Sequence, residues 1–221
     1  MSTFVIGDTH LPFEHKRYLQ FCISINKKYK CKNIVHIGDL VDNHSISYYE
    51  HDVNGWSPAK EMEIADEHLQ EWFKAFPRVK LCRGNHDNLV DRKAKTVGLP
   101  KRCFQSYREI WKLPKGWEDG FEFEIDGVIY KHGTGYSGKY GHVQAAIDSR
   151  QSTVIGHLHS SAGIEYMCNS KQIMFGMNCG SGINRKKYAF AYGKDSRRKP
   201  VISCGVVFDS KNAQVIPMPM S

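Results

Sequence analysis

The sequence lacks any long apolar run. No stretch approaches the roughly 20 consecutive apolar residues that a membrane-spanning helix needs. The first residues, MSTFVIGDTH, also lack the basic start, apolar centre and cleavage site of a secretory leader. We therefore expect a cytoplasmic protein that makes no use of a membrane.

Closely spaced cysteine pairs are absent as well. Seven cysteines are scattered along the 221 residues, and none of them forms a CxxC or CxxH motif. Disulfide frameworks and structural zinc sites usually show such pairs, so we expect reduced thiols. Internal repeats and low-complexity tracts are also missing, and an aromatic content of 12% argues against disorder. The length then fits a single domain covering residues 1–221.

The positive charge is concentrated in two segments. Residues 88–112 carry +5 and residues 184–200 carry +6, which together exceed the net charge of +8. Clustered Lys and Arg side chains attract phosphates, which favours an anionic partner such as nucleic acid. Solvated loops that keep the protein in solution are the alternative interpretation of the same charge.

Short β-branched runs alternate with amphipathic stretches in the first half of the chain. Helices are predicted over Phe13–Lys30 and over Pro58–Phe76, the second with Ser57 as its N-cap. This alternation indicates parallel βαβ units, whereas Phe121–Lys131 has the pattern of an antiparallel hairpin around an Asp-Gly turn. The predicted strands are Thr3–Ile6, Asn33–Ile37, Arg78–Cys82, Phe121–Ile125, Val128–Lys131, Thr153–Ile155, Ile164–Cys168, Gln172–Met177, Val201–Phe208 and Ala213–Pro217.

Polar side chains follow five of these runs, at the carboxyl ends where open α/β sheets bind ligands. Asp8 and His10 are two residues apart, as are His157 and His159, so in an extended segment each pair projects to one side. The glycines beside these residues let the backbone turn sharply. The complete set of polar residues at strand ends is Asp8, His10, Asp39, Asn85, His86, His132, His157 and His159.

Each of these residues alone has an ordinary explanation. A Gly-Asp or Gly-Asn pair at a strand end is usually a turn, and a lone buried histidine is usually a core residue with satisfied hydrogen bonds. Together, however, carboxylate, amide and imidazole groups make a mixed oxygen and nitrogen set. Such a set suits Mn²⁺, Fe or Zn²⁺ better than Ca²⁺ or a thiolate-bound metal.

The five blocks resemble the signature of the calcineurin-like metallophosphoesterase superfamily, in which DxH, GDxxD, GNH[DE], a single His and GHxH follow in this order. In this chain they read Asp8-Thr9-His10, Gly38-Asp39-Leu40-Val41-Asp42, Gly84-Asn85-His86-Asp87, His132 and Gly156-His157-Leu158-His159. The resemblance implies an α/β fold, a four-layer sandwich of two mixed β-sheets flanked by helices. The motif core covers residues 3–160, followed by a C-terminal strand-rich portion with the basic segment 184–200.

The resemblance also implies a role for each block residue. His86 would be the general acid near the leaving oxygen, and Asp42 would hydrogen-bond His86 and set its tautomer. The cofactors would be two divalent metal ions, with Mn²⁺ favoured and Fe, Zn²⁺ or Ni²⁺ as alternatives. The implied ligands are Asp8, His10 and His159 for one ion, Asn85, His132 and His157 for the other, and Asp39 shared by both.

These assignments predict a two-metal-dependent phosphoesterase that attacks its substrate with a metal-activated hydroxide. We favour a phosphodiesterase acting on a nucleotide or nucleic acid, because the ligand set is complete and the surplus charge is basic. A phosphomonoesterase is the first alternative. The superfamily's protein phosphatases carry Arg where this chain has Asn43, which disfavours that class. A non-catalytic metal-binding scaffold is disfavoured because His86 and every ligand are present.

The segment that follows the second block is rich in aromatic residues. Residues 44–56 read HSISYYEHDVNGW. This segment is either a substrate loop on which a base or aryl group stacks or a surface loop whose aromatics tuck against the sandwich. The sequence also leaves open the oligomeric state and the role of the basic segments in binding substrate.

Overall fold

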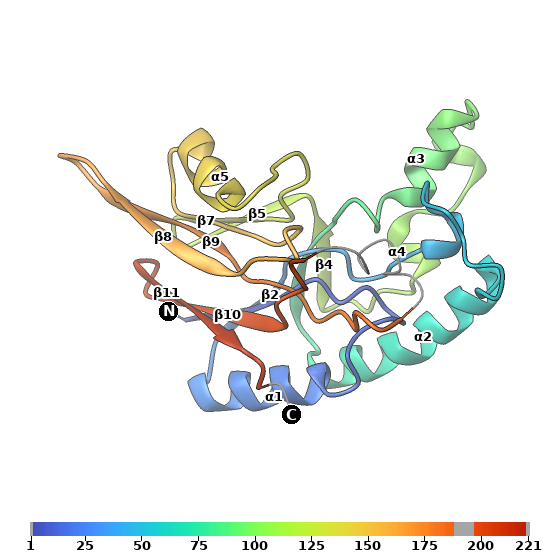
Figure 1. Cartoon of the computed structure of the whole chain (residues 1–221), viewed down its shortest axis with the longest axis horizontal. Coiled ribbons are helices and arrows are strands. Elements are labelled where there is room, and N and C mark those ends of the chain that lie inside the picture. Colours follow the sequence, from blue (N-terminus) through green and yellow to red (C-terminus); the bar gives the residue numbers. More distant parts are fainter. Residues whose placement is uncertain (1, 188–196, 220–221) are drawn as a thin grey trace.

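Two mixed β-sheets face each other at the centre of the molecule (Figure 1), which is a computed structural model describing residues 2–187 and 197–219. The first sheet has the order β11-β10-β1-β2-β3-β4. Strands β1 to β4 run parallel, β10 is antiparallel to β1, and β11 is antiparallel to β10. Its strands are Thr3–Ile6 (β1), Asn33–His36 (β2), Val79–Cys82 (β3), Trp117–Gly120 (β4), Ser203–Phe208 (β10) and Asn212–Pro217 (β11).

The second sheet has the order β5-β6-β7-β9-β8. Strands β6, β7 and β9 run parallel, and the edge strands β5 and β8 are antiparallel to their neighbours. Its strands are Glu122–Ile125 (β5), Val128–Lys131 (β6), Thr153–Ile155 (β7), Gly163–Cys168 (β8) and Ile173–Asn178 (β9). The predicted hairpin is therefore present as β5 and β6.

The alternation of side chains along β1 shows how the layers are joined. Phe4 and Ile6 belong to a core beneath helices α1 (Tyr18–Tyr29) and α2 (Pro58–Ala75), whereas Val5 belongs to a core that includes residues of both sheets. All three side chains are fully buried because both faces of the first sheet are covered. Helix α5 (Gly141–Ser149) packs on β7 and β9 of the second sheet. The expected four-layer sandwich of two mixed sheets flanked by helices is confirmed (Figure 1).

Helix α1 begins five residues later than the sequence pattern indicates. The predicted start at Phe13 is wrong, because residues 11–13 form a separate buried segment and the helix begins only after the exposed Lys16 and Arg17. Leu11 donates its backbone N–H to Leu40 O at 2.9 Å, and Phe13 is fully buried against Trp56 at a ring separation of 5.5 Å. Apolar periodicity cannot distinguish such a segment from a first helical turn.

Several short elements have no counterpart among the elements predicted from the sequence. Strand β4, with the sequence WEDG, has no β-branched residue, and Trp117 alone anchors it in the core. The other elements without a predicted counterpart are α3 (Leu89–Thr96), α4 (Tyr107–Ile110), α5, and the 3₁₀ turns η1 (His44–Ile46) and η2 (Lys101–Cys103). Within the described ranges, no helix combines the length and apolar character needed to cross a membrane.

Candidate metal centre

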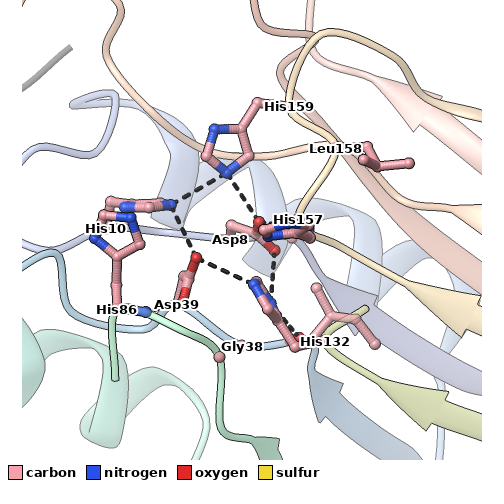
Figure 2. A network of polar contacts seen from close by, with 12 residues as sticks. Asp8, His10, Gly38, Asp39, His86, His132, His157, Leu158 and His159 are labelled. Atoms are coloured by element: carbon pink, nitrogen blue, oxygen red, sulfur yellow. Dashed lines mark hydrogen bonds and ion pairs between the residues drawn. The ribbon is translucent and has the colours of Figure 1, made fainter. Parts of the chain in front are cut away.

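The carboxyl ends of five strands, three from the first sheet and two from the second, deliver all the predicted site residues. Asp8 and His10 follow β1, Asp39 follows β2, and Asn85 follows β3. His132, His157 and His159 follow β6 and β7. Figure 2 shows the side chains of Asp8, His10, Asp39, His132 and His159 pointing toward one another. The structure therefore brings together residues that are up to 151 positions apart in the chain.

One group of convergent atoms comes from Asp8, His10, Asp39 and His159. Each offers one potential ligand atom, and these atoms all lie within 4.8 Å of one another. The Nε2 atoms of His10 and His159 are 3.2 Å apart, and His159 Nε2 is 3.0 Å from Asp8 Oδ2. Two imidazole nitrogens directed at the same carboxylate-lined space form the kind of donor set that divalent transition metals bind.

A second group shares Asp39 with the first. Asp39, His132 and His157 also present ligand atoms within 4.8 Å of one another. His132 Nε2 lies 3.1 Å from Asp39 Oδ2 and 3.1 Å from the amide oxygen of Asn85. All seven predicted ligands thus lie in two adjoining groups joined by one carboxylate.

The backbone at this site is strained. His10, Asp39 and His157 have φ angles of 52°, 45° and 65°, in the left-handed region that residues other than glycine rarely adopt. Such conformations persist only where the surrounding structure enforces them, and they concentrate at functional sites. Here the strain aims three of the predicted ligands at the same space.

The buried carboxylates fit a cation. Asp8 is fully buried and Asp39 is 1% exposed, and Asp8 Oδ1 has no hydrogen-bond partner among the residues that the structure describes. Burial raises the pKa of Asp39, but the charges of His132 and His86 outweigh it and hold the pKa well below its usual value. A pair of buried, ionised carboxylates with an unsatisfied oxygen is stabilised by a bound metal ion.

His86 is held by Asp42 at the edge of this cluster. His86 Nδ1 lies 2.8 Å from Asp42 Oδ1 and 2.7 Å from the backbone oxygen of Asp42. Burial lowers the pKa of His86, but the charges of Asp39 and Asp42 raise it to about 10. Asp39 and Asp42 therefore favour the imidazolium form of His86, and bound cations would oppose this shift in pKa through their own charge.

Asp42 also contacts His10, a contact that the sequence did not predict. His10 Nδ1 lies 3.3 Å from the same Oδ1 atom that holds His86. The Asp42 carboxylate thus orients two histidines: His10, a predicted metal ligand, and His86, the predicted general acid.

Two further polar residues shape the site, and the sequence gives them no role. Asp87 is buried and accepts hydrogen bonds from Gly84 N at 2.8 Å, Val41 N at 3.2 Å and the Tyr107 hydroxyl at 2.8 Å, which ties the second and third blocks together. Asn178, at the end of β9, donates to Leu158 O at 2.9 Å and so fixes the last block. Asp87 lies within a signature block, whereas nothing in the sequence marks Asn178.

The aromatic segment 44–56 divides its side chains between two environments. Glu61 of α2 accepts hydrogen bonds from His44 N at 2.7 Å and Ser45 N at 2.8 Å, which anchors the start of the segment. Trp56 packs on Phe13 at the other end. Between them Tyr48 and Tyr49 are 53% and 52% exposed. These two tyrosines line a cavity of ≈ 230 Å³ with Ser47, Asn85, His86, Leu89 and Arg92.

Comparison with known proteins identifies the family of this chain. A sequence profile of the calcineurin-like phosphoesterase family matches residues 1–174, and the chain belongs to this family. No curated protein matches the chain. Its fold is similar to a metallophosphoesterase from Sphaerobacter thermophilus, at 14% identity, a TM-score of 0.44, and coverage of 99% of this chain and 88% of that one.

Two other solved structures are also similar to this chain. The phosphoesterase YfcE from E. coli is 14% identical with a TM-score of 0.42, and the match covers 94% of this chain and 88% of that one. Vacuolar Protein Sorting 29 from Cryptosporidium parvum is 12% identical with a TM-score of 0.46, covering 99% of this chain and 98% of that one.

Family membership establishes the class of reaction. The family consists of phosphoesterases that use a dinuclear centre of divalent metal ions, and this chain is a metal-dependent hydrolase of phosphate esters.

Proposed function

We propose that this protein is a cytoplasmic phosphodiesterase acting on a nucleotide or nucleic acid, with residues 1–221 forming one catalytic domain. Mn²⁺ is the favoured metal in both positions. The proposed ligands are Asp8, His10 and His159 for one ion, Asn85, His132 and His157 for the other, and Asp39 for both. The two groups of ligand atoms within 4.8 Å, joined at Asp39, support this division.

The chain's own residues contribute binding, orientation and proton transfer. When bound, two divalent cations acidify the attacking water and neutralise charge on the phosphoryl oxygens. Asp42 keeps the Nδ1 proton of His86 engaged, which leaves Nε2 to donate its proton to the departing oxygen. The imidazolium form of His86, favoured by Asp39 and Asp42, is the form that can act as an acid.

The side chain of Asn43 is the observation that carries the preference for a diester. Asn43 Nδ2 donates to the backbone oxygen of His86 at 3.0 Å, so this side chain supports the acid loop and adds no positive charge at the phosphate. A monoester carries up to two negative charges at neutral pH, whereas a diester carries one. A site with an amide at this position is better matched to the single charge of a diester.

Hydrolysis of two nitrophenyl esters tests this proposal. We expect bis(4-nitrophenyl) phosphate to turn over with Mn²⁺ at a higher kcat/KM than 4-nitrophenyl phosphate, and we expect a chelator to abolish both reactions. A preference for the monoester would identify a phosphomonoesterase. Absence of turnover with either ester across Mn²⁺, Fe²⁺, Zn²⁺ and Ni²⁺ would contradict the proposed assignment of the site.

The basic segments support a nucleic-acid substrate. In residues 88–112, Arg108 pairs with Asp119 at 3.1 Å and Lys112 with Asp66 at 2.9 Å, so these two charges are partly offset. Lys95, Lys101 and Arg102 are exposed. Of the second segment, 184–200, residues 188–196 lie outside the described part of the chain. On either side of them Lys186, Arg197 and Arg198 are exposed, and Lys187 is half-buried.

We expect single-stranded DNA or RNA to bind with an affinity that falls as salt is raised. Each phosphate contact with a single strand contributes about 0.7 to the slope of log K against log[salt]. Replacing Lys186, Lys187, Arg197 and Arg198 with Gln should then reduce the slope by about 3. Fluorescence anisotropy at several salt concentrations measures the slope.

A variant with the same change in charge provides the control. Lys27, Lys28, Lys30 and Lys32 lie at and just after the end of α1 and are exposed. Replacing these four with Gln should leave the slope close to wild type. An equal reduction in both variants would mean that only net charge matters, and binding that does not respond to salt would leave the basic segments as solvated loops.

A further inference from the structure

The cavity beside His86 is the part of the site that the metal ligands do not explain. It has a volume of ≈ 230 Å³ and is bounded by the third block on one side and by Tyr48 and Tyr49 on the other. His86, the proposed proton donor, lines it directly. A group released after receiving a proton from His86 would therefore leave through, or be held in, this cavity.

Tyr48 is fixed in position by helix α3. Its hydroxyl lies 3.2 Å from Thr96 Oγ1, and Lys93 Nζ lies 3.9 Å from the centre of its ring. Arg92 Cζ lies 5.2 Å from the same ring centre. Contacts between cations and the ring hold the aromatic plane in one orientation, although about half of the side chain is exposed.

Arg92 supplies a positive charge at the same cavity. It is exposed, and no carboxylate of residues 2–187 or 197–219 is found within ion-pair distance of it. An arginine that lines a cavity without an acidic partner is suited to bind a phosphate, and two neighbouring tyrosine rings are suited to stack a flat base. Charge, aromatic rings and the proposed proton donor thus meet in one small space.

We propose that this cavity is the leaving-group pocket of the enzyme and that it takes a nucleotide. The base of that nucleotide stacks on Tyr48 and Tyr49, and Arg92 pairs with its second phosphate. This inference rests on the proposed phosphodiesterase function and adds the identity of the group released. A preferred substrate is then a chain of at least two nucleotides in which the released nucleotide carries its own phosphate.

Two alkyl diesters that differ only in the leaving group test the pocket. One is a dinucleotide whose released nucleoside carries a terminal phosphate, and the other is the methyl ester of the same retained nucleotide. Wild-type enzyme should prefer the dinucleotide in kcat/KM. Stacking on an aromatic side chain is worth about 1–3 kcal/mol per base, so Tyr49→Ala should reduce this preference by about 5- to 140-fold. Tyr49→Phe keeps the ring and should retain the wild-type preference.

Arg92 is tested with the same pair of diesters. Arg92→Gln should lower the preference for the dinucleotide that carries the terminal phosphate, and removal of that phosphate from the substrate should abolish the difference between Arg92→Gln and wild type. Tyr166→Ala is the matched control for Tyr49→Ala, because Tyr166 is 43% exposed on β8 and does not line the cavity. Unfolding midpoints of all variants establish that each one is folded.

The outcomes separate the pocket from the proposed function. Hydrolysis of both diesters at equal kcat/KM, or an equal effect of Tyr49→Ala on both, would overturn the pocket while the phosphodiesterase stands. Failure of wild type on both diesters would overturn the phosphodiesterase. In that case binding of a nucleoside monophosphate decides the pocket: the Kd should rise in Tyr49→Ala and not in Tyr49→Phe, and equal Kd values would overturn the pocket as well.

Discussion

Replacing His86 with alanine should lower the turnover of an alkyl phosphodiester by about 10²- to 10⁴-fold, the usual contribution of a positioned general acid. An alkoxide is a poor leaving group unless it receives a proton, and Asp42 holds His86 ready to give one. The bound metal per chain should stay close to the wild-type value, because His86 lies beside the two proposed ligand groups and belongs to neither. Single-substrate kinetics and elemental analysis measure the two quantities.

The leaving group provides the internal control for this variant. Nitrophenolate departs without a proton, so His86→Ala should slow bis(4-nitrophenyl) phosphate much less than the alkyl diester. His51→Ala is the matched variant, because His51 is exposed in the same aromatic segment and does not line the cavity. Equal turnover of wild type and His86→Ala on the alkyl diester would remove His86 as the acid. Loss of metal together with activity would make it a structural residue of the metal site.

Much of the fold was predictable because short runs of β-branched residues form its buried strands. β1, β6 and β7 have the predicted bounds, since each is a short β-branched run buried on both faces. The N-cap of α2 was predicted as well: Ser57 Oγ accepts from Lys60 N at 3.3 Å. Parallel strands then place their carboxyl ends at one edge, so a list of polar residues after strands predicts a cluster without any knowledge of distances.

The cavity could not be predicted in this way, because it depends on contacts between distant segments. Tyr48 is oriented by Lys93 and Thr96 of α3, and nothing in the sequence of residues 44–56 indicates that this segment packs on α3. Asn178 could not be predicted either, because its side chain donates a hydrogen bond to the backbone of Leu158, 20 residues earlier in the chain. Side chains whose role is to hold another segment show no pattern in their own neighbourhood.

The sequence predicts that the glycines of the signature blocks allow sharp turns, but this explanation accounts for only some of them. Gly38 has a φ of +115°, so the expected sharp turn is present there. At Gly84 and Gly156 the requirement is space. A Cβ atom on Gly84 would lie 2.1 Å from Asp39 Oδ1, and one on Gly156 would lie 2.1 Å from Asp8 Oδ1. Each glycine therefore allows a strand end to approach a buried carboxylate.

Gly84→Ala should reduce both the bound metal and kcat, the latter by about 10²-fold or more, because a displacement of about 1 Å at a reacting centre has an effect of this size. The added methyl would also lie 2.6 Å from Asp39 N, so rotation of the carboxylate alone cannot relieve the contact. Asp39 is the residue shared by the two proposed ligand groups, and moving it disturbs both. Elemental analysis and steady-state kinetics measure the two losses.

Gly163→Ala separates this effect from the general consequence of adding a methyl group. Gly163 begins β8, and a Cβ there would meet nothing within 4 Å, so this variant should bind metal and turn over like wild type. If Gly84→Ala kept full metal content and activity, Asp39 would have to tolerate a shift that leaves both metal positions intact. The tight approach of the third block to Asp39 would then be a packing feature alone. A loss confined to Gly84→Ala would instead mean that the glycine is retained because the shared carboxylate needs the space beside it.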